Sequence, residues 1–344
     1  MNDSSPTRIA LATALVLGLG AIPAATAGEV PVKLIRVGII GLDTSHVVAF
    51  TSVLNNPNAK GDLAGFKVVA AYPGGSPDVA ASRDRVAGYT AELRDKEKVE
   101  IVASVEALIA LVDVVLLESV DGRPHFAQVE PVLKAKKPVF IDKPVAGTLA
   151  DAMRIFRLAD EQGTPCFSSS SLRYNPALVA LKNDPKIGAV IGCETFSPCS
   201  LEQHHPDLFW YGVHGVESLF TVMGTGCVSV TRAHSIGTDF VTGTWERGRI
   251  GTFRGIREGK ADYGTLIFGS KGVGYVQGAG GYEPLVVEIA RFFRTGKPPV
   301  SATETLELFA FMEAADESKR NGGVPVTIQS VMEKAARTAG SARK

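Results

Sequence analysis

The sequence has little cysteine, no excess of either charge and no repeated segment. Its four cysteines, Cys166, Cys193, Cys199 and Cys227, include no C-x-x-C pair, so neither a zinc ribbon nor a redox pair is indicated. If the protein is exported, Cys193 and Cys199 could form a disulfide, and buried free thiols are the alternative. Lys+Arg and Asp+Glu both number 36, which argues against general nucleic-acid binding. With 45% hydrophobic residues among 344, the composition excludes a collagen, a coiled coil and a disulfide-dense small domain.

No apolar run is long enough to cross a bilayer. The longest candidate spans residues 9–22, whereas a membrane helix needs ~20 residues. It follows Arg8 and precedes Ala25 and Ala27 in small-x-small positions, which is typical of a secretory signal peptide over residues 1–27. We therefore expect an exported, periplasmic or extracellular protein without stable membrane insertion after cleavage. An uncleaved anchor or a disordered tail is the alternative.

Strand-like and helix-like segments alternate through the first half of the chain. KLIRVGIIGL, residues 33–42, is almost continuously apolar and suits a strand buried on both faces of a parallel sheet. LADAMRIFRLADEQG, residues 149–163, has the spacing of an amphipathic helix. The alternation predicts an α/β domain over residues 31–172, built on a doubly wound parallel sheet with right-handed crossovers.

The second half of the chain has a different pattern. Residues 186–280 are rich in Gly, Thr and β-branched residues in short strand-like runs, which predicts an antiparallel sheet in an α+β domain over residues 173–344. Two helical segments, from Pro284 to Arg294 and from Ala302 to Lys319, are expected to close the chain. FGSKGVG lacks the spacing of a phosphate-binding loop and is interpreted as a hairpin turn.

The carboxyl ends of the predicted parallel strands are the expected ligand site. IDKP, residues 141–144, follows one such strand, and Lys143 could hold a substrate hydroxyl or carbonyl there. A surface lysine after a strand is the structural alternative. Because these ends gather at one edge of a sheet, Gly41, Tyr72, Glu118–Asp121 and Asp142–Lys143 should line one crevice.

The order of motifs resembles the Gfo/Idh/MocA family, which includes glucose–fructose oxidoreductase and inositol dehydrogenase. The segments that carry the resemblance are RVGIIGL, the stretch from VDVVLLES to VFIDKP, SLRYNP, YGVHGVESLFTVMG and ETLELFAFMEAADESKRNGGVPVTI. Together they cover nearly all of the chain after residue 33. The resemblance implies a Rossmann domain, a substrate domain with a large antiparallel sheet, bound NAD or NADP, and oxidation or reduction of a sugar or cyclitol.

The sequence departs from the family at the nucleotide fingerprint, G-x-G-x-x-G. Only Gly41 remains in GLDTSH, residues 41–46, and Asp43 would place bulk and negative charge beside a pyrophosphate. Capping of the following helix is the alternative role for Asp43, Thr44 and Ser45. No acid ends the second strand, and the Gly-Gly-Ser after Tyr72 favours NADP weakly. The residues expected at the cofactor site are Gly41, Asp43, Ser45, His46, Tyr72, Asp121, His125 and Asp142.

The second departure lies in the segment that resembles the family's catalytic helix. Family members commonly carry D-x-x-x-H there; His214 matches the histidine, but Trp210 replaces the aspartate. The resemblance therefore carries over Lys143 and His214, with Lys143 holding the reacting oxygen and His214 accepting its proton. Trp210 suits stacking on a sugar, and Glu217 could share the helix face of His214.

Two further groups are weaker candidates. His204, His205 and Asp207 are close enough in sequence to bind a divalent metal, and a polar loop beside the pocket is the alternative. Arg173 and Tyr174, at the expected domain junction, are candidate substrate residues, with packing as the alternative role.

Three functions are compatible with the sequence. The first is an NAD(P)-dependent oxidoreductase acting on a carbohydrate, with the sheet domain as the surface for a homo-oligomer. The second is a nicotinamide-free sugar lyase, epimerase or hydrolase, and the third is a non-catalytic sugar-binding protein. Lys143 and the strand order favour the first. The signal peptide favours the others, because it lacks a twin-arginine pair and an unfolded exported chain carries no dinucleotide. A filled pyrophosphate groove at Asp43 would favour them too.

Overall fold

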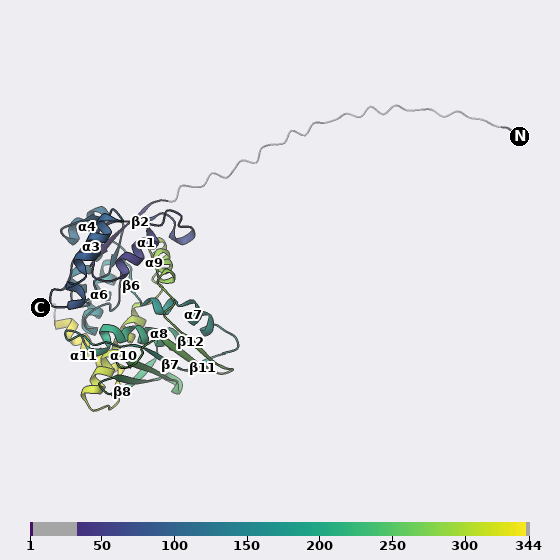
Figure 1. Ribbon diagram of the computed structural model, residues 1–344. Helices are drawn as coiled ribbons and strands as arrows, with labels where there is room; N and C mark the ends of the chain where they lie inside the picture. Colours follow the sequence, from purple (N-terminus) through teal and green to yellow (C-terminus); the bar gives the residue numbers. More distant parts are fainter. Residues whose placement is uncertain (3–32, 342–344) are drawn as a thin grey trace. The chain divides into compact units, whose positions relative to one another are not determined.

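The computed structural model describes residues 1–2 and 33–341 (Figure 1). The predicted signal peptide, residues 1–27, therefore lies outside the described residues except for the first two. Across the described part of the chain, no helix has both the length and the apolar character of a membrane span.

Six parallel strands form the first sheet, in the order β3-β2-β1-β4-β5-β6 (Figure 1). They are β1 (Ile35–Ile40), β2 (Phe66–Tyr72), β3 (Glu100–Ile101), β4 (Val114–Leu117), β5 (Val139–Ile141) and β6 (Cys166–Ser168). Every residue of β4 and β5 is buried, as expected where helices cover both faces. The doubly wound parallel sheet predicted from the sequence is confirmed.

Helices between these strands build the two covering layers. They are α1 (His46–Leu54), α2 (Ala80–Arg83), α3 (Val86–Asp95), α4 (Val105–Leu111), α5 (His125–Lys134) and α6 (Leu149–Gln162). The apolar sides of α4, α5 and α6 share one buried cluster with β4 and β5, whereas α1 and α3 pack into a second cluster on the opposite face.

One helix from the C-terminal part of the chain also covers this sheet. The sequence analysis placed it within residues 173–344, but α9 (Glu283–Thr295) packs against α1 and the first sheet. Phe292 lies 4.9 Å from Phe167 of β6 between ring centroids. Amphipathic spacing indicated the helix correctly but could not tell which sheet its apolar side would cover.

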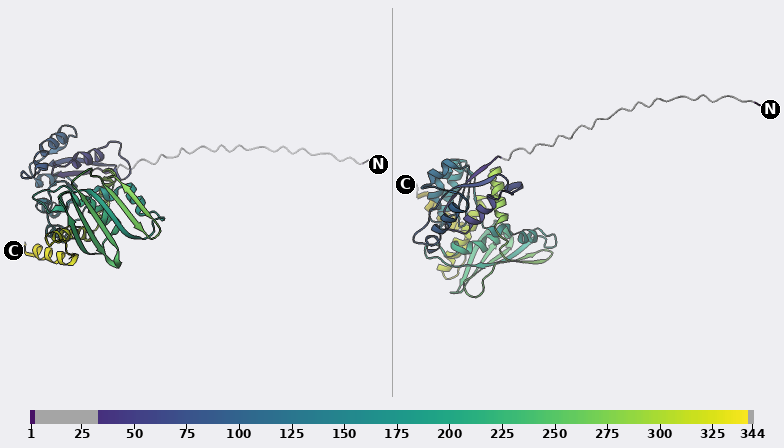
Figure 2. Two further views of the ribbon diagram at one scale, coloured as in Figure 1. Left: turned by 60° about the horizontal axis from the view of Figure 1, so that its bottom comes forward. Right: turned by 45° about the horizontal axis from the view of Figure 1, so that its top comes forward.

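A seven-stranded sheet forms the second layer, in the order β12-β11-β7-β10-β9-β8-β13 (Figure 2). Its strands are β7 (Val190–Pro198), β8 (Cys227–His234), β9 (Thr238–Trp245), β10 (Ile250–Ile256), β11 (Gly264–Gly269), β12 (Val273–Gln277) and β13 (Val326–Thr327). The sheet is mainly antiparallel as predicted, and β11 and β12 form the expected hairpin. The exception is β10, which pairs in parallel with β7 because two strands and a helix separate them in the chain.

Helices cover one face of this sheet. They are α7 (Pro176–Lys182), α8 (Val213–Met223), α10 (Ala302–Arg320) and α11 (Ile328–Ser341). All eleven residues of α8 are buried, which fixes its orientation between the sheet and the rest of the body. The helix α11 was not predicted from the sequence; it buries Ile328, Val331, Ala335 and Ala339 on one side.

All four cysteines are buried free thiols. Burial raises the pKa of Cys166 and of Cys199 to about 12, so neither is a reactive thiolate at neutral pH. A Cys193–Cys199 disulfide is not formed, and the free-thiol alternative is confirmed.

A buried arginine holds strands of the second sheet to α10. Arg232 of β8 is 1% exposed and its guanidinium lies 2.7 Å from a carboxylate oxygen of Asp239 on β9. The same guanidinium binds Asp316 of α10 and Asp207 of the loop before α8. Burial raises the pKa of Asp316 to about 7, so this carboxyl depends on its cationic partner to ionise.

We predict that Arg232→Met destabilises the protein by roughly 3–5 kcal/mol, because it leaves buried carboxyls without their cation. Equilibrium unfolding in urea measures this. The matched control is Arg254→Met on β10, an exposed arginine over the Phe240 ring, which should cost less than about 1 kcal/mol. Equal losses for the two variants would contradict the structural role of Arg232.

Candidate functional site

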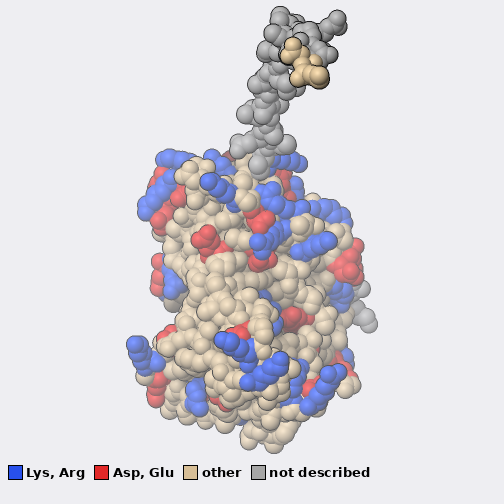
Figure 3. All heavy atoms as spheres, turned by 90° about the vertical axis from the view of Figure 1, so that its right-hand side faces the viewer, with Lys and Arg blue, Asp and Glu red and all other residues tan. Residues whose placement is uncertain are grey.

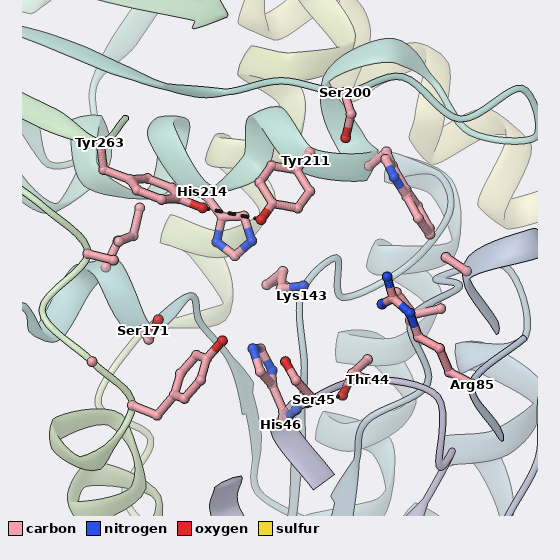
Figure 4. Close-up of a pocket in the computed structure, with 17 residues that line it drawn as sticks. Thr44, Ser45, His46, Arg85, Lys143, Ser171, Ser200, Tyr211, His214 and Tyr263 are labelled. Carbon is pink, nitrogen blue, oxygen red and sulfur yellow. Dashed lines mark hydrogen bonds between the residues drawn. The ribbon is translucent and has the colours of Figure 1, made fainter. Parts of the chain in front are cut away.

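A cavity of about 630 Å³ lies between the carboxyl edge of the first sheet and α8 (Figure 4). The β1–α1 turn contributes Thr44, Ser45 and His46, and the turn after β5 contributes Lys143. The second sheet domain contributes aromatic side chains and His214. Its volume and mixed lining are typical of a small-molecule site.

Lys143 points into the centre of this cavity (Figure 4). It follows β5 directly and is joined to Pro144 by a cis peptide bond. Its side chain is only 9% exposed, yet its Nζ makes no hydrogen bond or ion pair with any described residue. A buried cation without a protein partner is free to bind a ligand.

His214 of α8 lies beside Lys143 in the same cavity (Figure 4). Its Nδ1 is 2.8 Å from Ser170 Oγ, and the Tyr211 ring packs edge-on against it. Burial, and then the positive charge of Lys143, hold the pKa of His214 well below its usual value. The imidazole is therefore neutral at pH 7, and with Nδ1–H donating to Ser170 its Nε2 can accept a proton.

Aromatic side chains close the side of the cavity that belongs to the second domain. A π-helical turn, Leu208–Gly212, precedes α8 and carries Trp210 and Tyr211, both of which line the cavity. The hydroxyls of Tyr211 and Tyr263 are 3.2 Å apart. Such faces suit the apolar side of a sugar or cyclitol ring, in agreement with the role predicted for Trp210.

His46 occupies the position of the third fingerprint glycine and reaches back to β5. Its ring stacks on Phe50, with centroids 5.1 Å apart, and its Nδ1 lies 2.7 Å from Asp142 Oδ2. Burial opposes ionisation of Asp142, but His46 and Lys143 outweigh it and hold its pKa at about 2. Asp142 also accepts a hydrogen bond from the Lys143 backbone, so it orients the turn that carries the lysine.

Asp43 is completely buried and turned away from the cavity. Its Oδ1 accepts a hydrogen bond from Val120 N at 2.8 Å, and its Oδ2 accepts one from Ser82 Oγ at 2.6 Å. It does not cap α1, whose N-cap residue is Ser45 and whose first turn has no side-chain cap. The helix-cap interpretation is therefore wrong for Asp43, whose carboxylate finds donors across the sheet edge instead, whereas Thr44 Oγ1 accepts a hydrogen bond from His46 N at 3.2 Å.

The segment after β2 lies over this edge of the sheet. Pro73 O accepts a hydrogen bond from Leu42 N at 2.8 Å, and Ser82 anchors the segment to Asp43. Arg123 then joins the segment to the β4 loop through Asp78 at 2.9 Å and Asp121 at 2.7 Å. We call residues 73–85 the strap.

The strap and its neighbours bury most of the expected cofactor residues. Gly41 keeps the turn, since its φ is +86° and a Cβ there would lie 2.4 Å from Ser119 N. Both His125 ring nitrogens bond to backbone carbonyls, and Asp121 is 1% exposed. Of the expected cofactor residues, Ser45 and His46 line the cavity, and the others do not.

Glu118 adds a third buried carboxyl beneath the fingerprint turn. Neither of its carboxyl oxygens has a hydrogen-bond partner among the described residues. Burial, then the nearby Asp142 and Asp43, hold the pKa of Glu118 well above its usual value. Asp43 and Glu118 therefore place two buried carboxyls beneath the turn that would receive a pyrophosphate, which does not favour a second negative charge there. The cavity itself extends between this turn and the strap, where Thr44, Ser45 and Arg85 line it.

The candidate metal ligands are engaged elsewhere. His205 lies between Asp121 and Glu202, His204 pairs with Glu202, and Asp207 pairs with Arg232 and Lys319. No group of three or more metal-ligating side chains is found in the described residues. The divalent metal expected as an alternative has no site there.

The candidate substrate residues at the domain junction lie behind the cavity. Arg173 pairs with Glu217 at 2.5 Å and with Glu304 at 2.7 Å, and the buried Tyr174 hydroxyl has no described partner. None of Arg173, Tyr174 and Glu217 lines the cavity. The sequence analysis missed Ser170, Tyr211 and Arg85; only the serine run before SLRYNP and the Tyr-Gly before the helix signalled two of them.

Comparisons with known proteins place this geometry in a wider context. Residues 35–170 match the model of the Gfo/Idh/MocA oxidoreductase family, described as an NAD-binding Rossmann fold. A probable dehydrogenase from Thermotoga maritima superimposes with a TM-score of 0.72 at 19% identity, covering 86% of this chain and 100% of its own. A scyllo-inositol dehydrogenase from Lactobacillus casei, solved with NAD(H) and scyllo-inositol, gives 0.67 at 14%, covering 86% and 100%. A search of curated proteins gave no match.

The solved structures share the arrangement of a parallel sheet followed by a large, mainly antiparallel one. At these identities they establish the fold, while the family match rests on the first domain. The resemblance found in the sequence is thus confirmed: residues 35–170 match the model of the Gfo/Idh/MocA oxidoreductase family, and the solved structures share the fold of the whole body.

Proposed function

We propose that this protein acts on a hydroxyl or carbonyl group of a sugar or cyclitol, with Lys143 and His214 as its catalytic pair. The observation that carries the proposal is their meeting in one cavity, Lys143 as an unpaired cation and His214 as a neutral base. The family match supports oxidoreduction as the class of reaction.

The two residues divide the proton chemistry of an alcohol between them. Lys143 Nζ binds the reacting oxygen and stabilises the negative charge that develops on it. His214 Nε2 accepts the hydroxyl proton, while Ser170 on Nδ1 holds the ring in place. Trp210 and Tyr211 pack against the ring of the substrate and exclude water.

A hydride acceptor completes an oxidation, and the family resemblance implies NAD or NADP for that role. The buried Asp43 carboxylate, which stands in the fingerprint turn and is held there by Ser82 and Val120, favours a second candidate. In that candidate, the same pair transfers protons without a hydride acceptor, as in a sugar lyase or epimerase. A non-catalytic sugar-binding protein would use the same cavity without turnover.

The setting of the protein is part of the proposal. The pattern of residues 1–27 supports export by a cleaved signal peptide. The sheet face opposite α8 and α10 is open in Figure 2 and carries exposed Ile191, Ile250 and Tyr275, which supports a homo-oligomer formed through this sheet.

We predict that Lys143→Ala and His214→Ala each lower turnover by roughly 10²–10⁴ without unfolding the protein. Turnover is measured on the sugar or cyclitol, found in a substrate panel, that wild type converts fastest. Lys134→Ala, an exposed lysine on α5, is the matched control and should keep full activity. A variant of the pair that also keeps full activity would show that its residue is scaffold.

The pKa of His214 provides a test that needs no substrate. Since burial and Lys143 lower this pKa, NMR titration of the His214 ring should give a midpoint below 6.5, with the neutral form present above it. Lys143→Met removes the positive neighbour and should move the midpoint up. A wild-type midpoint above 6.5 would contradict the assignment of His214 as a neutral base.

Dinucleotide binding separates the two candidate reactions. The Asp43 carboxylate is buried beneath the turn that would hold a pyrophosphate, so its negative charge opposes a bound dianion even though it faces away from the cavity. We therefore expect calorimetry to show weak binding of NAD(H) and NADP(H) to wild type, and at least tenfold stronger binding of one of them to Asp43→Gly.

Two control variants separate charge from occlusion at this position. Asp43→Asn removes the charge but keeps the side-chain volume, and Ser82→Ala frees the strap but keeps the charge. Tight binding by wild type that Asp43→Gly does not improve would reject the nicotinamide-free candidate.

A further inference from the structure

The cavity has cationic lining residues and no acidic ones. Its formally charged lining residues are Arg85 and Lys143, and none of the described residues lining it is Asp or Glu. The outer surface differs, since Lys and Arg are interspersed with Asp and Glu on the face in Figure 3. A cavity whose charged residues are all positive, in a protein of zero formal net charge, indicates a negatively charged ligand.

The nearest carboxylates face away from the cavity. Asp43 bonds to Ser82 and Val120, and Asp142 bonds to His46 and to the Lys143 backbone. Both are completely buried. Neither carboxylate can therefore pair with Arg85 or with Lys143 Nζ from inside the cavity.

Arg85 is also unlike the arginines around it. Arg83 pairs with Asp84, and Arg123 pairs with Asp78 and Asp121, but Arg85 has no ion pair or side-chain hydrogen bond with any described residue. It lies at the side of the cavity opposite Tyr263, with Lys143 between them (Figure 4). The guanidinium is thus available to a ligand.

Asp43 positions Arg85 through the strap. Arg85 N donates to Ser82 O at 3.0 Å, and Ser82 Oγ donates to Asp43. Asp43 therefore anchors, through Ser82, the turn that carries the Arg85 guanidinium. This link gives Asp43 a positioning role.

The first turn of α1 faces the same part of the cavity. It contains no acidic residue, and the exposed Ser45 makes no side-chain cap bond. His46 N donates to Thr44 Oγ1, and the remaining N–H groups of the turn and the helix dipole favour an anion. Lys143 has no partner among the described residues, is only 9% exposed and points into the cavity (Figure 4). It is an independent sign of an anionic or electron-rich ligand there.

The anion need not belong to a dinucleotide. The cavity of about 630 Å³, which Arg85 of the strap lines, suits a single small molecule. A carboxylate is planar and accepts two parallel hydrogen bonds from a guanidinium.

We propose that the cavity binds a sugar acid, a uronate or an aldonate, whose carboxylate lies between Arg85 and the N-terminal turn of α1. In this orientation Lys143 and His214 face a carbon on the opposite side of the ring or chain. That second contact rests on the proposed function, but the carboxylate subsite does not.

The test compares matched ligands and variants by calorimetry at low ionic strength. Glucuronate is paired with glucose, and gluconate with glucitol, so that each pair differs in one carboxylate. The proteins are wild type, Arg85→Met and Arg83→Met, the last being an exposed arginine two residues away, at the end of α2 and outside the cavity.

We expect wild type and Arg83→Met to bind at least one acid roughly 10- to 100-fold more tightly than its neutral partner. Arg85→Met should lose this preference and keep its affinity for the neutral partner. Equal binding of acid and neutral ligand by wild type, or an undiminished preference in Arg85→Met, would overturn the proposal.

A dinucleotide arm distinguishes the source of the anion. If Arg85→Met weakens binding of NADP⁺ or pyrophosphate but not of any acid, the guanidinium serves the cofactor and the sugar-acid proposal is overturned, while the proposed function stands. If acid preference depends on Arg85 but Lys143→Ala and His214→Ala keep full turnover, the subsite stands and the proposed function fails.

Discussion

The inward-facing carboxylate of Asp43 is the interaction on which the site depends. By accepting hydrogen bonds from Val120 N and Ser82 Oγ, it ties the ends of β1 and β4 to the strap. Burial of a carboxylate is costly unless such donors are present, so this position is satisfied only while the strap is in place. These two hydrogen bonds of Asp43 hold the strap against the carboxyl edge of the first sheet. Because Arg85 N donates to Ser82 O, they also orient Arg85 beside the cavity.

The open half of the cleft keeps the groups that proton chemistry needs. Lys143 supplies a cation whose Nζ makes no hydrogen bond or ion pair with any described residue. Burial, and then this positive charge, hold the pKa of His214 well below its usual value, so the imidazole stays neutral. The His46–Asp142 pair orients the turn that carries Lys143, because Asp142 also accepts a hydrogen bond from the Lys143 backbone. The first domain thus matches an NAD-binding oxidoreductase family, while the turn that holds the family fingerprint carries Asp43 and His46 in place of glycines.

Much of the fold was predictable because strands buried on both faces and amphipathic helices leave strong periodic signals. Lys143 and His214 were predictable because each stands in a motif. The tertiary contacts were not predictable. A single sequence cannot show that Asp43 bonds across the sheet edge, that α9 packs on the first sheet, or that Glu217 pairs with Arg173 behind the cavity. Arg85 was not predicted, because an exposed arginine leaves no local signal in the sequence and its place beside the cavity depends on the tertiary fold.

The central proposal is that the cavity of this protein takes a small polar molecule and binds a dinucleotide only weakly. Native mass spectrometry of the purified protein, followed by denatured release of bound molecules, tests it most directly. The account predicts that no NAD or NADP is released, even from protein incubated with an excess and desalted. Release of one dinucleotide per chain would contradict it.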